Sequence, residues 1–258
     1  LIFVIVSAVP AGYQRATGAE LRLTPPGEAD TQGARHCLDS LEGIELYYPP
    51  GWGVGYEGLG RNTFACFESY AWMHNRYGAY GIGDGRFFDA VIPNAVDPAK
   101  WSMADSDGYA LFVGRLISRK GPDIAGEIAR AVGMPLVLAG GGVQSVEEHM
   151  TNPPRGPRRI TATDGTVITG DVTHVGAVSG DDRRWLFAHA EVLICPTRYI
   201  GPWEGVHAEA MMSGVGVVAP DYGVFTETLP AGYRYRTLNQ AVAAVHAGRA
   251  TRGEAWRD

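Results

Sequence analysis

The stretch Cys195-Pro-Thr-Arg-Tyr-Ile-Gly-Pro-Trp-Glu-Gly-Val-His-Ala-Glu-Ala-Met-Met-Ser-Gly-Val-Gly-Val-Val-Ala-Pro220 is the most informative part of this chain. It reads as the end of an apolar strand, a loop rich in glycine and proline, a helix that opens near Gly205, and a second apolar strand over 215–219. This order is typical of a parallel βαβ unit. The free N–H groups of a helix N-terminus favour an anion, and Glu209, one turn into the helix, is placed to accept hydrogen bonds from a sugar hydroxyl. The stretch therefore predicts a site for a phosphate beside a polyol.

The segment that precedes this stretch repeats the alternation of strand and helix. Apolar strands are predicted over 109–114, 135–139, 171–175 and 192–195, and helices over 122–132, 146–150 and 181–189. Pro122 suits the first turn of its helix, where a missing N–H costs nothing. Apolar strands that alternate with helices indicate a doubly wound parallel sheet covered on both faces, and so an α/β fold.

The first hundred residues are less regular. Strands are predicted over 1–9 and 44–48, and a helix over 64–77. A short strand followed by Asn, Asp and Pro within 89–98 indicates a boundary. We predict a short or partial Rossmann-like domain over residues 1–95 and a second Rossmann-like domain over residues 96–258.

Composition narrows the class of protein. A net charge of −6 over 258 residues argues against a nucleic-acid partner, which would need a positive field. The three cysteines, Cys37, Cys66 and Cys195, have neither metal-ligand nor disulfide-framework spacing. No apolar run reaches the roughly 18 residues that span a bilayer. We expect a cytoplasmic protein with at most peripheral contact at the inner face of the membrane, and, because the sequence begins at Leu1 and not at Met, a processed chain or a fragment.

Four motifs follow one another along the chain. They are Val91-Ile-Pro-Asn-Ala-Val-Asp97, Phe112-Val-Gly-Arg-Leu-Ile-Ser-Arg-Lys-Gly121, Leu138-Ala-Gly-Gly-Gly142 and the segment from Gly201 to Gly214. In order and spacing they resemble the motifs of the retaining family-4 glycosyltransferases. The resemblance implies a GT-B architecture of two Rossmann-like domains, here with a reduced N-terminal one. It also implies a nucleotide-diphosphate sugar as donor substrate, with no cofactor and no bound metal.

The resemblance assigns roles to individual residues. Arg115 and Lys120 match the basic pair that holds the donor diphosphate, and a planar fork beside a mobile point charge suits that task. Glu209 matches the second acid of the family's Glu-x7-Glu motif, which binds the ribose hydroxyls. The first acid falls at Gly201, while Glu204 stands where the family has glycine. Either Glu204 replaces the missing carboxylate or the donor sugar loses that contact.

Other positions are implied less specifically. The further donor-binding residues are Gly114, Gly141, Gly142, Val175, Gly201, Trp203, Gly205 and Val206. The plainer alternatives are solvated loop cations for the basic pair, a dipole-favoured first-turn acid for Glu209, and packing at strand ends for the glycines and Val175.

Three further side chains lie near these motifs or in the N-terminal half. We interpret His207 as a surface residue of its helix. Glu68 and His74 are candidate acceptor-side residues if the helix that carries His74 faces a cleft. The aromatic spacing of Phe67, Tyr70 and Tyr77 suits a helix packed on the core equally well.

The function predicted is transfer of a sugar from a UDP- or GDP-linked donor to an acceptor hydroxyl with retention of configuration. Arg115, Lys120 and Glu204 would form the catalytic set, with the diphosphate charge also met by the helix N-terminus near Gly205. The acceptor, a glycan, a lipid-linked sugar or a small molecule, stays open. The first alternative is a non-catalytic or weakened nucleotide-sugar-binding protein, favoured by Gly201 and the short N-terminal half. The second is a GT-B-fold epimerase, for which no acid and base pair is evident.

Overall fold

The computed structural model describes residues 21–22, 34–38, 45–48, 63–85, 89–94, 96–147, 158–253 and 256. The predicted strand over 1–9 lies outside these residues. The chain forms two units. One comprises Leu1–Ala95 with Ile200–Trp203, and the other comprises Val96–Tyr199 with Glu204–Asp258.

A six-stranded sheet forms the centre of the second unit, in the order β11-β7-β6-β12-β13-β14, and all of its pairs are parallel. Its strands are β6 (Ala110–Val113), β7 (Leu136–Ala139), β11 (Val172–His174), β12 (Val192–Ile194), β13 (Gly216–Pro220) and β14 (Arg234–Tyr235). Its helices are α2 (Pro122–Ala131), α3 (Gly180–His189), α4 (Val206–Met212), α5 (Phe225–Thr228) and α6 (Leu238–Ala250). Short 3₁₀ turns are η1 (Pro98–Lys100), η2 (Ser118–Lys120) and η3 (Ala231–Tyr233). The strands and helices predicted for this region from buried apolar runs are therefore present, apart from the one over 146–150.

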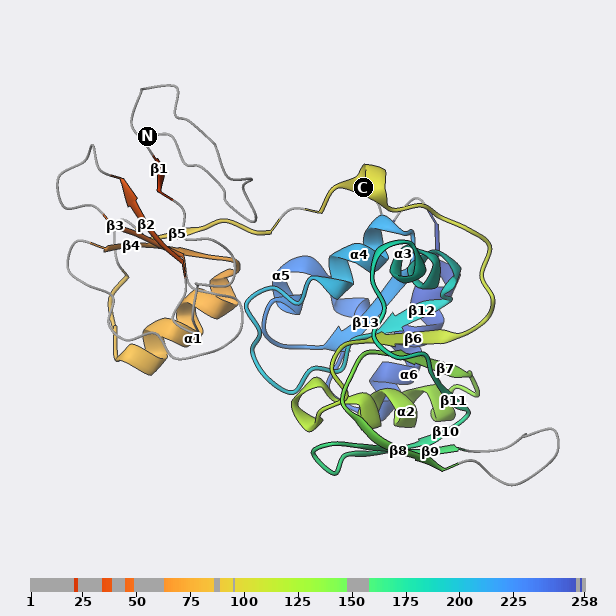
Figure 1. Ribbon diagram of the computed structural model, residues 1–258. Helices are drawn as coiled ribbons and strands as arrows, with labels where there is room; N and C mark the ends of the chain where they lie inside the picture. Colours follow the sequence, from red (N-terminus) through yellow and green to blue (C-terminus); the bar gives the residue numbers. More distant parts are fainter. Residues whose placement is uncertain are drawn as a thin grey trace. The chain divides into compact units, whose positions relative to one another are not determined.

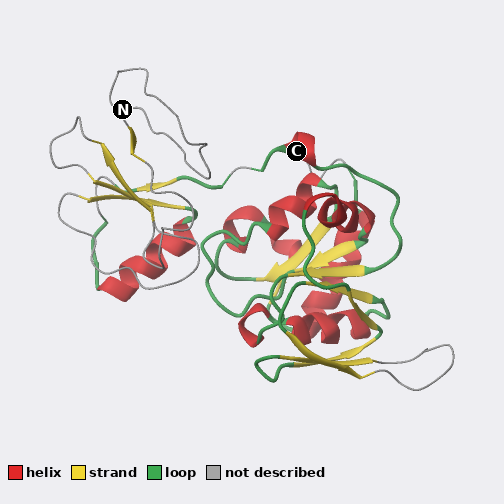
Figure 2. Ribbon diagram, in the orientation of Figure 1, coloured by secondary structure: helices red, strands yellow, loops and turns green. Residues whose placement is uncertain are grey.

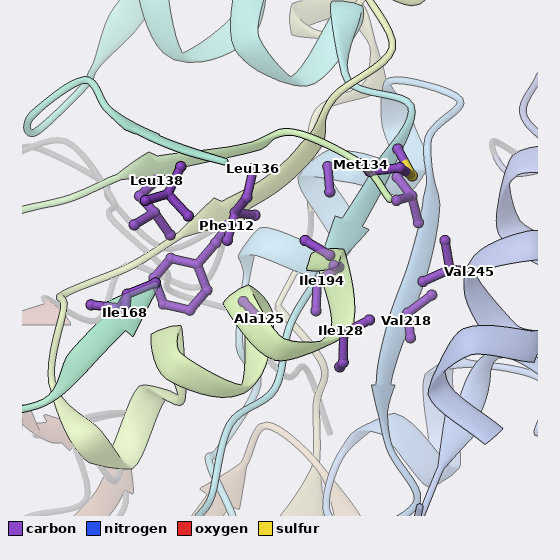
Figure 3. Close-up of a cluster of buried hydrophobic side chains, with 14 of the residues drawn as sticks. Phe112, Ala125, Ile128, Met134, Leu136, Leu138, Ile168, Ile194, Val218 and Val245 are labelled. Atoms are coloured by element: carbon purple, nitrogen blue, oxygen red, sulfur yellow. The ribbon is translucent and has the colours of Figure 1, made fainter. Parts of the chain in front are cut away.

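Helices cover both faces of this sheet, α2 and α6 on one side and α3 and α4 on the other (Figures 1 and 2). Because successive strand residues point to opposite faces, Phe112, Leu136 and Ile194 meet Ile128 of α2 and Val245 of α6 in one core (Figure 3). The intervening residues of β6, β12 and β13 are also buried. A sheet with two buried faces explains why its strands read as continuous apolar runs.

The strand order reverses at the centre of the sheet. From β6 the chain moves outward to β7 and β11, and it then returns to place β12 on the other side of β6. In open parallel sheets, ligands bind at the carboxyl ends of the strands where the order reverses. The fold therefore directs attention to the loops that follow β6 and β12.

A separate antiparallel sheet contains β8 (Val143–Glu147), β9 (Arg158–Ala162) and β10 (Val167–Gly170). The helix predicted over 146–150 is wrong where the structure describes it, because residues 146 and 147 belong to β8. The cause is a partner strand that lies beyond the local sequence window. Ile160 and Ile168 are fully buried, and Ile168 contacts α2 closely enough that a Cβ at Gly126 would lie 2.9 Å from it.

The first unit contains a five-stranded sheet in the order β1-β2-β3-β4-β5 and the helix α1 (Tyr70–Tyr80). The strands are β1 (Leu21–Arg22), β2 (Ala34–Leu38), β3 (Glu45–Tyr48), β4 (Thr63–Phe67) and β5 (Ala90–Val91). The pairs from β3 to β5 are parallel and those from β1 to β3 are antiparallel, so parallel pairing holds for only part of this sheet.

The helix predicted over 64–77 begins later than expected. Residues 63–67 form β4, whose aromatic and β-branched residues favour a strand. Ser69 then caps α1, because its side chain accepts a hydrogen bond from the Trp72 N–H at 3.2 Å. Among the helices that the structure describes, none has the length and apolar character needed to cross a bilayer.

Candidate functional site

The loops after β6 and β12 touch each other at the point where the strand order reverses. Gly121 has a φ of +73°, and a Cβ at this position would lie 2.2 Å from the carbonyl oxygen of Pro196. The Arg198 N–H also donates to the Arg119 carbonyl at 2.8 Å. Glycine is therefore required at position 121 on two grounds, backbone conformation and close approach.

Lys120 and Glu204, which these two loops carry, form an ion pair. Lys120 Nζ lies 2.6 Å from Glu204 Oε2, and the two side chains are 21% and 5% exposed. Burial lowers the pKa of Lys120, but the Glu204 carboxylate and the Tyr199 hydroxyl outweigh that effect and raise it. The other oxygen of this carboxylate, Oε1, is buried and accepts no hydrogen bond from the described residues. The site thus holds a protonated lysine and a carboxylate with one oxygen that receives no hydrogen bond from the described residues.

The backbone at Glu204 is in the left-handed region, with a φ of +59°, which no other described residue except glycine adopts. Such a conformation costs an ordinary residue about 1–2 kcal/mol. His207 stabilises this turn, because its Nδ1 lies 2.7 Å from the Glu204 carbonyl oxygen and so donates to it. The interpretation of His207 as a surface residue is wrong: the side chain is buried against Phe225, and burial lowers its pKa.

Arg115 lies on the loop after β6, where its side chain is exposed and makes no ion pair or hydrogen bond with the described residues. The predicted donor-binding glycines Gly114 and Gly141 lie close to the same loop. A Cβ at Gly140 would lie 1.8 Å from the Gly114 carbonyl oxygen, and the Leu116 N–H donates to the Gly141 carbonyl at 2.8 Å. The carboxyl ends of β6 and β7 are therefore in direct backbone contact.

The end of β11 joins this group of loops. The Gly140 N–H donates to the Gly176 carbonyl at 2.7 Å, and the Val175 N–H donates to the Leu138 carbonyl at 3.0 Å. Val175 itself is 43% exposed, at the end of the edge strand β11. Gly142, with a φ of +100°, turns the chain from this edge into β8.

Glu209 lies in the first turn of α4, after Gly205 and Val206, and pairs with Arg183 of α3. Arg183 Nε donates to Glu209 Oε2 at 3.0 Å, and Nη2 donates to the same oxygen. Burial raises the pKa of Glu209, while the charge and hydrogen bonds of Arg183 act against this rise. The arginine partner was not foreseen, since it lies 26 residues away in the sequence.

Two further polar side chains that sequence reasoning missed, Arg198 and Asp164, hold the loop of Lys120 in place. Arg198 donates to the Ser118 carbonyl and to both carboxylate oxygens of Asp123, with Nη1 at 2.9 Å from Oδ1. Asp164, in the turn between β9 and β10, accepts the Ser118 N–H at 2.6 Å. The β9–β10 hairpin and the loop after β12 therefore both position η2.

The segment Ile200–Trp203, with the predicted site residues Gly201 and Trp203, belongs to the first unit. Ser69 donates its hydroxyl to the Pro202 carbonyl at 2.8 Å, and Ile200 packs against the cluster of Phe67, Trp72 and Tyr77. The segment is thus part of that unit's core.

The structure does not bring the two candidate acceptor-side residues into one pocket. Glu68 follows β4 at its carboxyl end and is 2% exposed, and burial raises its pKa to about 7. His74 instead lines a cavity of about 460 Å³ beside the second half of α1, together with Tyr77 and Asp89. Glu68 does not line this cavity. Among the described residues, no three His, Cys, Asp or Glu side chains gather as a metal site requires.

Comparison with known proteins decides the family. The family model described as "Glycosyl transferases group 1" matches residues 107–247, more than half of the chain. This chain belongs to the group 1 glycosyltransferases. The match begins just before β6 and ends within α6, so it covers the six-stranded sheet with the loops that carry Arg115, Lys120 and Glu204. A search of curated protein sequences gave no significant match.

Solved structures support the same fold for this group 1 glycosyltransferase. AviGT4, a glycosyltransferase involved in avilamycin A biosynthesis, is 22% identical with a TM-score of 0.55, over 82% of this chain and 67% of that one. Anabaena Alr3699/HepE, solved in complex with UDP and glucose, is 17% identical with a TM-score of 0.53, over 74% and 57%. Sucrose-phosphate synthase from Thermosynechococcus elongatus is 18% identical with a TM-score of 0.51, over 75% and 50%. The predicted α/β fold of the GT-B type is confirmed, and the chain spans about half to two thirds of the length of these proteins.

Proposed function

We propose that this chain transfers a sugar from a UDP- or GDP-linked donor to an acceptor hydroxyl, with retention of the anomeric configuration. The observation that carries the proposal is the partly buried Lys120–Glu204 pair at the reversal of strand order, in a chain of the group 1 family. A fixed cation at the carboxyl edge of a parallel sheet is suited to a diphosphate. The carboxylate beside it is suited to the sugar that the diphosphate carries.

The chemistry requires stabilisation of charge on the leaving group. When the bond between the sugar and the diphosphate breaks, negative charge develops on the phosphate oxygens, and Lys120 and Arg115 stabilise it. Arg115 offers a planar fork that no described residue occupies. Lys120 gives up part of its contact with Glu204 and binds the phosphate instead. Oε1 of Glu204 then accepts a hydrogen bond from a hydroxyl group of the transferred sugar.

The remaining donor contacts follow from the loops at the same edge. The base and ribose would lie against a wall formed by Gly114, Gly141, Gly142 and Val175. Glu209 would accept hydrogen bonds from the ribose hydroxyl groups. The backbone N–H groups of Trp203, Glu204 and Gly205 would face the sugar and phosphates, and Gly201 and Val206 stay candidate donor contacts. On the acceptor side, Glu68 and His74 stay candidate contacts, and the acceptor class is open.

Nucleotide release from UDP- and GDP-sugars tests the proposal. The wild-type chain should release nucleotide from at least one donor, and Lys120→Ala should lower the rate by a factor of about 100, because one preorganised charge contributes about 3 kcal/mol to such a transition state. Lys100→Ala is the matched control, since Lys100 is an exposed lysine paired with Asp97. Equal rates for the two variants would contradict the assigned role.

We further propose that the reaction needs no cofactor and no divalent metal. The expected result is full nucleotide release in excess EDTA, with no gain on adding Mg²⁺ or Mn²⁺. A rate that falls with EDTA and returns with one of these ions would contradict this part.

A nucleotide-sugar-binding protein without turnover is the second candidate. Gly201 lacks the carboxylate that the family motif has there, and Glu204 is engaged by Lys120. Binding of a donor sugar that is lost in Lys120→Ala, with no release on any donor or acceptor offered, would favour this candidate over the enzyme.

A further inference from the structure

Arg183 and Glu209 make a two-donor contact that ties α3 to α4. Both Nε and Nη2 of Arg183 donate to Oε2 of Glu209, the first at 3.0 Å. The two side chains are 25% and 21% exposed, so they are shielded from most of the solvent. The other carboxylate oxygen, Oε1, accepts no hydrogen bond within the described part of the chain.

The guanidinium group is itself held in place. Its central carbon lies 5.4 Å from the centroid of the Phe187 ring, and Phe187 is fully buried. The planar fork of an arginine loses little freedom on forming such a contact. Arg183 therefore restrains the rotation of the Glu209 side chain by holding Oε2, and it leaves Oε1 available to another donor.

The charge of Arg183 has a second effect. Burial alone favours the protonated form of Glu209, and the guanidinium opposes this. An ionised carboxylate is acceptor-only, whereas a protonated one donates through one of its oxygens. Burial outweighs the guanidinium, so the pKa of Glu209 is raised overall, and Arg183 limits this rise in favour of the ionised form that accepts hydrogen bonds from hydroxyl groups.

We propose that Arg183 is a positioning residue for ribose recognition, which presents the free oxygen of Glu209 to the 2′- and 3′-hydroxyls of the donor nucleotide. The inference rests on the proposed function, because it requires a nucleotide at Glu209. It extends that function to a residue outside the four motifs. An ion pair that only joined α3 to α4 would affect stability and leave selectivity for ribose hydroxyls unchanged.

Selectivity is measured as the ratio of the dissociation constants for 2′,3′-dideoxy-UDP and UDP, or for the guanosine pair if the wild type prefers GDP. The wild type should favour the ribose form about ten- to hundredfold, since hydrogen bonds to a charged group are strong. Arg183→Met and Glu209→Gln should both lower this ratio to about threefold or less. Arg183→Lys should give an intermediate ratio, because it keeps the charge and loses the fork.

Arg184→Met is the control on the same helix, since Arg184 pairs with the exposed Asp181. It should keep the wild-type ratio. If Arg183→Met does not fold, Arg183→Lys carries the test. A wild-type ratio in the Arg183 variants, with a loss only in Glu209→Gln, would overturn the inference and leave the proposed function standing. A wild-type ratio in Glu209→Gln would also overturn it, and a wild type that binds neither UDP nor GDP would overturn both.

Discussion

Glu204→Gln removes one charge from the Lys120–Glu204 pair and keeps the shape of the side chain. Breaking a fully buried ion pair costs about 3–5 kcal/mol and breaking an exposed one about 0–1 kcal/mol. Glu204 is 5% exposed and Lys120 is 21% exposed, so this pair is closer to the buried case but partly screened. We expect a loss of about 2 kcal/mol in the free energy of unfolding, which lowers the melting temperature by about 4–8 °C.

Thermal unfolding at pH 7 measures this loss, with Asp181→Asn as the control for an exposed pair in which the carboxylate is 96% exposed. The control should shift the melting temperature by about 1 °C or less.

The stabilisation from this pair depends on pH. The pKa of Lys120 is raised in the folded state, so the contribution of Lys120 to stability is fully present below its unfolded pKa and is lost as the pH rises through its folded pKa. The gap between Glu204→Gln and wild type should therefore persist at neutral pH and close in strongly alkaline solution. A variant no less stable than the control at pH 7 would refute the reasoning.

Two further predictions concern stability. Burial raises the pKa of Glu68 to about 7, so the stability that this group contributes is full below its unfolded pKa and is lost as the pH rises through 7. In urea unfolding, the free energy of unfolding of Glu68→Gln should therefore rise relative to that of the wild type by up to about 3 kcal/mol between pH 5 and pH 8. Parallel pH profiles of the two proteins would contradict this. Gly121→Ala should destabilise by about 3 kcal/mol or more, because its Cβ would collide with the Pro196 carbonyl, whereas Gly133→Ala, with a φ of +66° and no neighbour within 4 Å, should cost about 1 kcal/mol. Equal losses in denaturant midpoint for the two alanine variants would show that the approach to Pro196 is not rigid.

The parallel sheet was predictable because its signals are local. The strands β6, β7 and β12 are continuous apolar runs, and Pro122 marks the first turn of α2. By contrast, residues 63–67 have an aromatic spacing that a helix face also shows, and only pairing with β3 and β5 makes them a strand. The strand β8 depends in the same way on β9, whose residues begin eleven positions later.

The site residues could also be predicted where their signals are local, and not where they depend on distant partners. The positions of Lys120, Glu204 and Glu209 could be proposed from motif spacing, since each lies at a strand end or helix start that the sequence marks. The partners of Glu209 and Asp123, Arg183 and Arg198, lie 26 and 75 residues away, and no local pattern links them. Such pairs arise only when the sheet brings separate loops to one edge.

The same physical limit applies to His207. Its helix is short, and a polar residue two positions from Gly205 suggests exposure. The ring is nevertheless buried against Phe225, and the Glu204 carbonyl oxygen, which follows a left-handed residue, accepts a hydrogen bond from its Nδ1. Both partners depend on the fold of the loop and of α5, which the helix pattern alone does not show.

Equilibrium binding of UDP and GDP to Lys120→Ala and Lys100→Ala tests the central claim most directly, that the donor diphosphate binds where β6 and β12 end. The two variants remove the two lysines of the chain, one half-buried at this edge and one exposed on η1. We predict that calorimetry will show a dissociation constant at least tenfold larger for Lys120→Ala, which is a loss of about 1.4 kcal/mol in binding free energy. Lys100→Ala should keep the wild-type dissociation constant. Equal affinities in the two variants would contradict the account.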